Sequence, residues 1–132
     1  MYKFDNDGIG SGPYLNMAQC KENYFTQKDL DQGLSACALA GDNIIGKNYD
    51  DARRLFGKVV WVSNEYIEGT EIPAFVAVQA RGVARFVHSG GVPICGLGLR
   101  ANKDGSVTAT RTFHGVGAVV AANDKTCDVW LG

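Results

Sequence analysis

Residues 74–87, AFVAVQARGVARFV, decide the fold class that the sequence predicts. Small or apolar residues alternate with polar ones here, so that Phe75 and Ala77 fall on one face and Val76 on the other. Because residues two apart share a face of a β-strand, the pattern predicts a long extended segment with one side in a core. Gly82 is expected to mark a bend or bulge within this segment.

The flanking sequence favours further strands. Residues 58–62 (KVVWV) are β-branched and aromatic, as is typical of a strand. Turn residues separate four more expected strands, at residues 97–101, 106–112, 117–121 and 127–131. Such spacing, without alternating long helices, predicts an all-β fold: a small antiparallel barrel or sandwich with an extended N-terminal arm.

The arm is predicted to span residues 1–24, followed by a single β domain at residues 25–132. The glycines and proline of residues 8–13 (GIGSGP) disfavour a helix or strand, and no strand–helix context supports a dinucleotide fingerprint. Apolar side chains in an extended segment are good anchors for another protein. The predicted partner-binding residues are Tyr2, Phe4, Ile9, Tyr14, Leu15 and Met17.

Two short helical segments are considered. Thr26 and Asp29 stand at capping-box spacing, although a polar turn between two strands is equally compatible with this stretch. Residues 50–56 (DDARRLF) place acidic residues before basic ones, which suits one or two helical turns that end at Gly57.

Charge and hydropathy argue against some partners. The net charge of −1 gives no electrostatic case for nucleic acid, and no apolar run approaches the roughly 20 residues of a membrane helix. The first residues contain no apolar signal segment, so a reducing compartment is expected. Neither nucleic acid nor membrane is therefore an expected partner.

The cysteines are expected to be free thiols. Cys20, Cys37, Cys95 and Cys127 lie far apart without a CxxC pair, which disfavours a structural metal. The apolar runs around Cys37 (SACALA) and Cys95 (PICGLGL) predict that these two thiols are buried. Trp61 and Trp130, in apolar strands, are likewise expected in the core.

Catalytic chemistry is not expected. His88 and His114 are the candidates for a general base, but Ser89 directly follows His88, and strand neighbours point to opposite faces. Cys95 and His114 form a pair only if the fold brings them together. The sequence thus predicts no catalytic residue, no cofactor, no metal and no enzyme, with a small thiol or serine hydrolase as the alternative.

Residues 76–131 resemble the capsid decoration, or cement, proteins of tailed bacteriophages. The resemblance rests on the VQARGVARFVHSGG strand and turn, the VPICGLGL step, the NKDGSVTA hairpin, the GVGAVVA strand and the final TCDVWLG. It implies a structural virion protein that is made in the host cytoplasm, binds the outer surface of an assembled capsid and stabilises it.

The implied partners are the major capsid protein and further copies of this chain, with a trimer as one form. The resemblance supplies no catalytic residues. A tail or adhesin module that binds host-surface glycans through exposed aromatic residues stays open as another alternative.

Overall fold

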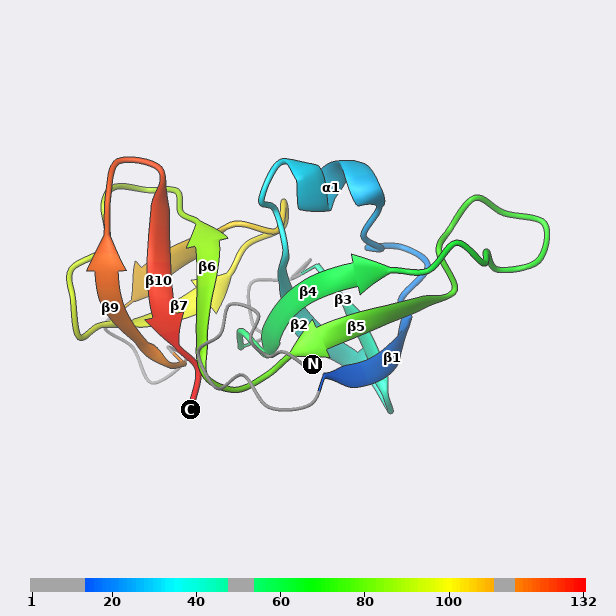
Figure 1. Ribbon diagram of the computed structural model, residues 1–132, viewed down its shortest axis with the longest axis horizontal. Helices are drawn as coiled ribbons and strands as arrows, with labels where there is room; N and C mark the ends of the chain where they lie inside the picture. Colours follow the sequence, from blue (N-terminus) through cyan, green and yellow to red (C-terminus); the bar gives the residue numbers. More distant parts are fainter. Residues whose placement is uncertain (1–13, 48–53, 111–115) are drawn as a thin grey trace, which may run out of the picture.

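The computed structural model describes residues 14–47, 54–110 and 116–132, which form a nearly all-β protein (Figure 1). Five strands close into a barrel in the order β1 (Leu15–Gln19), β3 (Ile44–Gly46), β2 (Ala36–Gly41), β4 (Gly57–Val62) and β5 (Phe75–Gln79). The β1–β3 pair is parallel, and the other barrel pairs are antiparallel. The predicted all-β class and barrel are confirmed.

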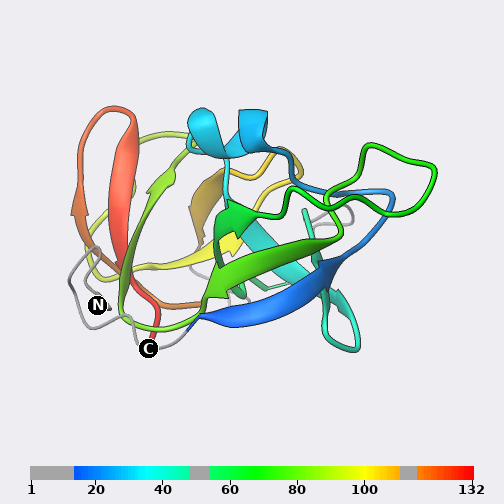
Figure 2. The same ribbon diagram turned by 45° about the vertical axis from the view of Figure 1, so that its right-hand side comes forward.

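Two smaller sheets lie beside the barrel in both views (Figures 1 and 2). One has the order β6 (Val83–Val87), β10 (Thr126–Trp130) and β9 (Ala118–Ala122), and the other pairs β7 (Gly98–Ala101) with β8 (Val107–Thr110). These strands confirm the expected downstream segments with small shifts at their ends, and the strand expected at 106–112 is described only as far as Thr110.

Gly82 separates two strands that the alternating pattern joined into one. β5 ends in the barrel at Gln79, and β6 begins in the other sheet at Val83. Gly82 has a φ of 79°, in the left-handed region that glycine adopts without a steric penalty. The expected bend is therefore confirmed, but the single long strand is wrong because the chain changes sheets here.

Strand β2 forms a wall between two hydrophobic cores. Ala36 packs into one core and its neighbour Cys37 into the other, since adjacent strand residues point to opposite faces. The core inside the barrel consists of Met17, Phe25, Cys37, Ile45, Val59, Val62, Val76 and Val78. The core between the barrel and the smaller sheets consists of Ala36, Leu55, Ala84, Phe86, Leu99, Ala101, Val107, Val119, Cys127 and Val129.

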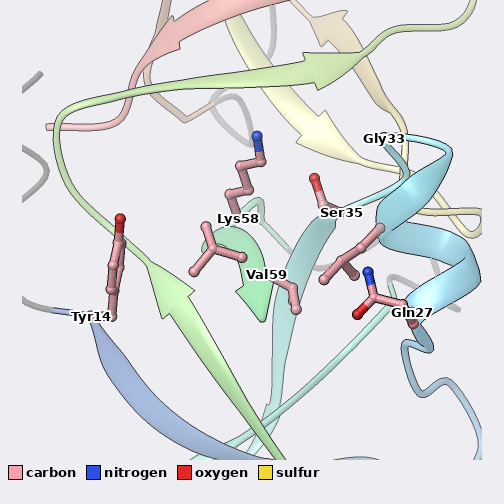
Figure 3. Close-up of a pocket in the computed structure, with 8 residues that line it drawn as sticks. Tyr14, Gln27, Gly33, Ser35, Lys58 and Val59 are labelled. Atoms are coloured by element: carbon pink, nitrogen blue, oxygen red, sulfur yellow. The ribbon is translucent and has the colours of Figure 1, made fainter. Parts of the chain in front are cut away.

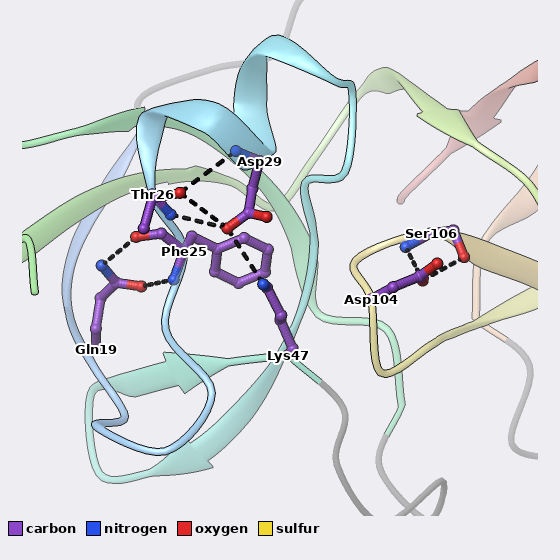
Figure 4. Close-up of polar contacts among 7 residues, drawn as sticks. All are labelled: Gln19, Phe25, Thr26, Asp29, Lys47, Asp104 and Ser106. Carbon is purple, nitrogen blue, oxygen red and sulfur yellow. Dashed lines mark hydrogen bonds and ion pairs between the residues drawn. The ribbon is translucent and has the colours of Figure 1, made fainter.

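The predicted arm boundary at residue 24 is wrong from Leu15 onwards. Strand β1 pairs with both β3 and β5 as part of the barrel, and Met17 is only 5% exposed. The buried amide of Gln19 donates to the Phe25 carbonyl (Figure 4). It also donates to the Pro73 carbonyl, and these bonds explain how a polar-looking segment enters a core.

The first helical prediction is confirmed as α1 (Gln27–Asp31). The Thr26 amide donates to Asp29 Oδ2 at 3.0 Å, and the Asp29 amide donates back to Thr26 Oγ1 at 3.4 Å, which completes the capping box (Figure 4). Lys47 forms a 3.2 Å ion pair with the same Asp29 carboxylate.

The second helical prediction fails where the structure describes it. Residues 50–53 lie outside the described residues, while Arg54 bridges to Arg100 and the Phe56 amide donates to the Cys37 carbonyl. Gly57 begins β4 instead of ending a helix. Extended pairing thus replaces the local helical preference.

Candidate functional site

Two half-exposed aromatic residues, Trp61 and Phe75, lie on the outer side of the barrel. Trp61 on β4 and Asn16 on β1 both lie opposite Ala77 of β5, while Phe75 lies opposite Ala18. Opposed residues share a face, and Phe75 and Ala77 are two apart on one strand. We name Trp61, Phe75, Ala77 and Ala18 the outer aromatic patch.

The two rings of the outer aromatic patch are accessible. Trp61 is 50% exposed and Phe75 is 51% exposed, with the small side chain of Ala77 between them. The prediction that Trp61 anchors the core is wrong, because a bulge between Val59 and Trp61 shifts the register. An extra residue in one strand reverses the alternation, so Val59 and Val62 point inward while Trp61 points outward.

Trp130 occupies an equivalent position on the three-stranded sheet. Cys127 and Val129 of β10 are buried, so the alternation places Trp130 on the outer face, where it is 50% exposed. The prediction of a core Trp130 is therefore also wrong. Asp128 lies two residues before Trp130 on β10. Its two carboxylate oxygens accept hydrogen bonds from the Arg85 guanidinium, at 2.8 and 3.2 Å.

The predicted partner-binding residues divide into three groups. Tyr14 and Leu15 are 40% and 45% exposed at the start of β1. Met17 belongs to the barrel core, so its prediction as a partner-binding residue is wrong. Tyr2, Phe4 and Ile9 lie outside the described residues.

A pocket of about 390 Å³ opens between strand β4, helix α1 and the segment that enters β2 (Figure 3). Its wall combines apolar and polar side chains: Tyr14, Gln27, Leu30, Gly33, Ser35, Lys58, Val59 and Val60. Ser35 is only 2% exposed, and its hydroxyl has no hydrogen-bond partner among the described residues. Since a serine nucleophile needs a hydrogen-bonded base, this Ser35 geometry does not form a catalytic dyad with Lys58.

The histidine and serine predicted to be poorly placed for catalysis are separated in the structure. His88 Nε2 lies 2.7 Å from the Asn123 carbonyl oxygen, and His88 Nδ1 is buried without a partner among the described residues. Ser89 Oγ instead accepts a 3.1 Å hydrogen bond from the Asn102 amide. Ser89 thus takes part in hydrogen bonds of the loop, and no base is bonded to it among the residues that the structure describes.

The four cysteines are free and differ in exposure. Cys95 is exposed, so its predicted burial is wrong. His114, with which Cys95 could pair only if the fold brought them together, lies outside the described residues. Burial raises the pKa of Cys37 to about 12, whereas burial and the Asp128 carboxylate raise the pKa of Cys127 to about 11. Two thiols are thus held neutral inside the cores.

A polar turn closes the β7–β8 hairpin. The Ser106 hydroxyl donates to Asp104 Oδ1 at 2.6 Å, and the Ser106 amide donates to the same oxygen at 2.9 Å (Figure 4). Burial opposes ionisation of Asp104, but these hydrogen bonds outweigh it, and the pKa is lowered. The carboxylate is therefore used to hold the turn.

The residues that the structure describes contain neither a metal-binding cluster nor a membrane-spanning helix. Among them, no group of three or more His, Cys, Asp or Glu side chains has the arrangement of a metal site. No helix in the same ranges has the length and apolar character needed to cross a membrane.

Comparison of the sequence with protein-family models and with curated proteins, and of the fold with solved structures, found no match. The candidate sites are therefore the outer aromatic patch and the pocket beside Ser35. Sequence reasoning missed Trp61 as a surface residue because the β4 bulge has no clear sequence signal. It placed Phe75 on one strand face without showing which face is exposed, and it missed Ser35 because its pocket is formed by distant segments.

Proposed function

We propose that this protein is a structural virion protein that binds the outer surface of an assembled phage capsid and stabilises it. The observation that carries the proposal is the outer aromatic patch, where Trp61 and Phe75 are half exposed on a rigid barrel face. Exposed aromatic residues on regular structure are typical anchors in protein interfaces. The resemblance of residues 76–131 to decoration proteins supports the same proposal.

Burial of the exposed aromatic rings would contribute favourable binding free energy. An aromatic side chain buries about 200 Å² in total, so covering the exposed half of each ring contributes about 2 kcal/mol before ordering costs. Each copy binds weakly by itself, but many copies that bind only the assembled shell raise the free energy of rupturing it.

The proposed partners are the major capsid protein and neighbouring copies of this chain. Tyr14 and Leu15 are further exposed apolar residues at the start of β1, and the preceding sequence contains Tyr2, Phe4 and Ile9. A capsid offers repeated symmetry positions, at which copies of one chain can associate as a trimer. The proposed location is the capsid surface of the virion.

Shell binding tests the proposal with a matched pair of tryptophans. We expect the full chain to bind phage heads stripped of it and to raise their disruption temperature. Trp61→Ala should weaken binding roughly thirtyfold, since about 2 kcal/mol is lost. Trp130→Ala removes an equally exposed ring from the other sheet and should bind like the unsubstituted chain.

Two outcomes would contradict this assignment. Absence of binding to heads at any stage of maturation would reject the decoration function. If Trp130→Ala weakens binding and Trp61→Ala does not, the attachment surface lies on the three-stranded sheet.

A second candidate function is binding of host-surface glycans. The half-exposed rings of Trp61 and Trp130 favour it, because an indole offers a flat apolar face together with an N–H donor. Saturable binding of a host glycan by the full chain, lost in either alanine variant and accompanied by no binding to heads, would support this function instead.

A further inference from the structure

Residues 63–74 form an ordered loop that joins β4 to β5 and projects from one end of the barrel (Figures 1 and 2). We name this segment the acidic loop. Its two arms continue the pairing of the strands: the Ala74 amide donates to the Glu65 carbonyl at 2.8 Å, and the Ile67 amide donates to the Ile72 carbonyl at 2.9 Å. These bonds hold the loop in shape before any partner binds.

The acidic loop surrounds an exposed ring with negative charge. It contains three glutamates and no lysine, arginine or histidine. Glu65, Glu68 and Glu71 are all exposed, and none of them forms an ion pair with another described residue. Tyr66, beside the first of them, is 56% exposed. Such a surface suits a partner that combines positive charge with an apolar pocket.

Two arginines lie side by side near the opposite end of β4. Arg54 lies opposite Arg100 in an antiparallel bridge, so both side chains lie on the same face. The neighbouring Leu55 and Leu99 are buried in the core, which places the two arginines on the outer face. Like charges on directly opposed residues are destabilising, and neither arginine has an ion pair within the described ranges. An anionic group between them would relieve this repulsion.

An apolar pocket of about 450 Å³ opens beside Arg54. Its other described walls come from Leu39, Leu55, Phe56 and Val116. Well-packed pockets of this kind hold the aromatic anchors of protein interfaces. We name the two arginines together with this pocket the arginine surface.

We propose that the acidic loop of one copy docks on the arginine surface of a second copy. Tyr66 enters the apolar pocket, and Glu65 and Glu68 face the two arginines. The charges of the two surfaces are complementary, which favours this contact over docking of either surface on its like.

The geometry makes this contact one between molecules. The acidic loop follows the last residue of β4, whereas Arg54 precedes its first residue, and a strand of six residues spans about 20 Å. The ordered loop therefore points away from the arginines of its own chain. The contact is heterologous, so copies associate into a closed ring or an open chain. It concerns copies of this chain alone and depends neither on capsid binding nor on the outer aromatic patch.

The test measures the mean mass of the purified full chain against its concentration by analytical ultracentrifugation. The contact is small, so we expect a reversible rise in mass with concentration. Glu68→Lys and Arg54→Glu should each weaken self-association about tenfold or more, because like charges then face each other. Asp124→Lys and Lys125→Glu make the same charge changes in the exposed turn before β10 and should leave self-association unchanged.

Mixing the two variants tests the head-to-tail arrangement. Glu68→Lys keeps its arginine surface and Arg54→Glu keeps its acidic loop, so each intact surface finds its partner in the mixture. We expect the mixture to associate more strongly than either variant alone. Unchanged circular dichroism of both variants, which alter exposed side chains, establishes that the fold is retained.

The proposal is overturned if the unsubstituted chain keeps the mass of one copy up to its solubility limit. It is equally overturned if the turn variants weaken self-association as much as Glu68→Lys and Arg54→Glu do. A mixture that associates no better than its components would assign self-association to another surface. No capsid is present in these measurements, so their failure leaves the shell-binding proposal to its own test.

Discussion

Gly57 begins β4 at a position where a side chain would collide with the neighbouring strand. A Cβ atom there would overlap the carbonyl oxygen of Gln79 and lie 3.0 Å from Val78 Cγ1. The contact is with backbone, so it cannot be relieved by a change of rotamer. The absence of a side chain at Gly57 lets the start of β4 approach β5 closely in the barrel wall.

Gly57→Ala is therefore expected to destabilise the protein by about 2 kcal/mol or more, because the β4–β5 pairing must shift. Chemical denaturation measures the change in the free energy of unfolding. Gly41→Ala is the control, since its new methyl group would meet Ile44 Cδ1 at an ordinary 3.5 Å. Equal stability of the two variants would contradict this view of the β4–β5 contact.

Cys37 links the stability of the barrel to alkaline pH. Its thiol is fully buried and donates to the Gly57 carbonyl at 3.4 Å, and its pKa is raised from 9.0 to about 12. The folded state thus favours the neutral thiol, while the unfolded chain ionises near its ordinary pKa. The stabilisation is complete below pH 9 and is lost as the pH rises from 9 towards 12.

We expect Cys37→Ser to flatten this dependence, measured as the slope of unfolding free energy against pH. The difference in slope between the unsubstituted chain and Cys37→Ser should reach at most about 1.4 kcal/mol per pH unit. Cys95→Ser, at an exposed thiol, should follow the unsubstituted chain. Parallel slopes for the unsubstituted chain and Cys37→Ser would show that Cys37 ionises equally in both states.

Strand β1 is held by the side chain at its last position. The Gln19 amide nitrogen donates to Phe25 O and Pro73 O, both at 3.0 Å, and its oxygen accepts from the Phe25 amide. One buried side chain thereby connects β1 to the approach to α1 and to the loop before β5. No local sequence pattern around Gln19 indicates these contacts between separate parts of the fold.

Gln19→Met keeps the volume of the side chain and removes all of these hydrogen bonds. We expect a loss of about 3 kcal/mol in unfolding free energy, because buried Phe25 and Pro73 backbone groups lose their partners. Gln32→Met, at the exposed end of α1, should change stability little. A Gln19→Met variant as stable as Gln32→Met would mean that water replaces the amide at no cost.

At the scale of the whole molecule, the barrel requires β1. This strand lies between β3 and β5 in the closed order, and it contributes Met17 to the core. Its removal would open the barrel and expose two strand edges.

Removing residues 1–13 keeps every described strand and core residue, so we expect the thermal unfolding midpoint to stay close to that of the full chain and occupancy on heads to fall. Removing residues 1–24 should abolish cooperative unfolding of the barrel. Calorimetry and shell binding measure both effects. Cooperative unfolding of a chain that lacks residues 1–24 would support the predicted arm boundary at residue 24. Full shell binding without residues 1–13 would show that the attachment surface lies within residues 14–132.

Local sequence determined where most elements form. β-Branched and aromatic residues predicted β4, alternation predicted the extended segment that became β5 and β6, and turn residues predicted β7 to β10. The Thr26–Asp29 spacing predicted the cap of α1. These signals depend on side-chain direction and hydrogen bonds within a few residues, so they can be read without knowing the partners.

Tertiary structure alone decided how those elements are used. Long-range pairing split residues 74–87 at Gly82, recruited β1 into the barrel and placed a bulge in β4. That bulge turned Trp61 to the surface, and the meeting of α1, β2 and β4 enclosed Ser35. The physical reason is that register, bulges and burial depend on contacts between residues far apart in the chain, whose energies no single segment contains.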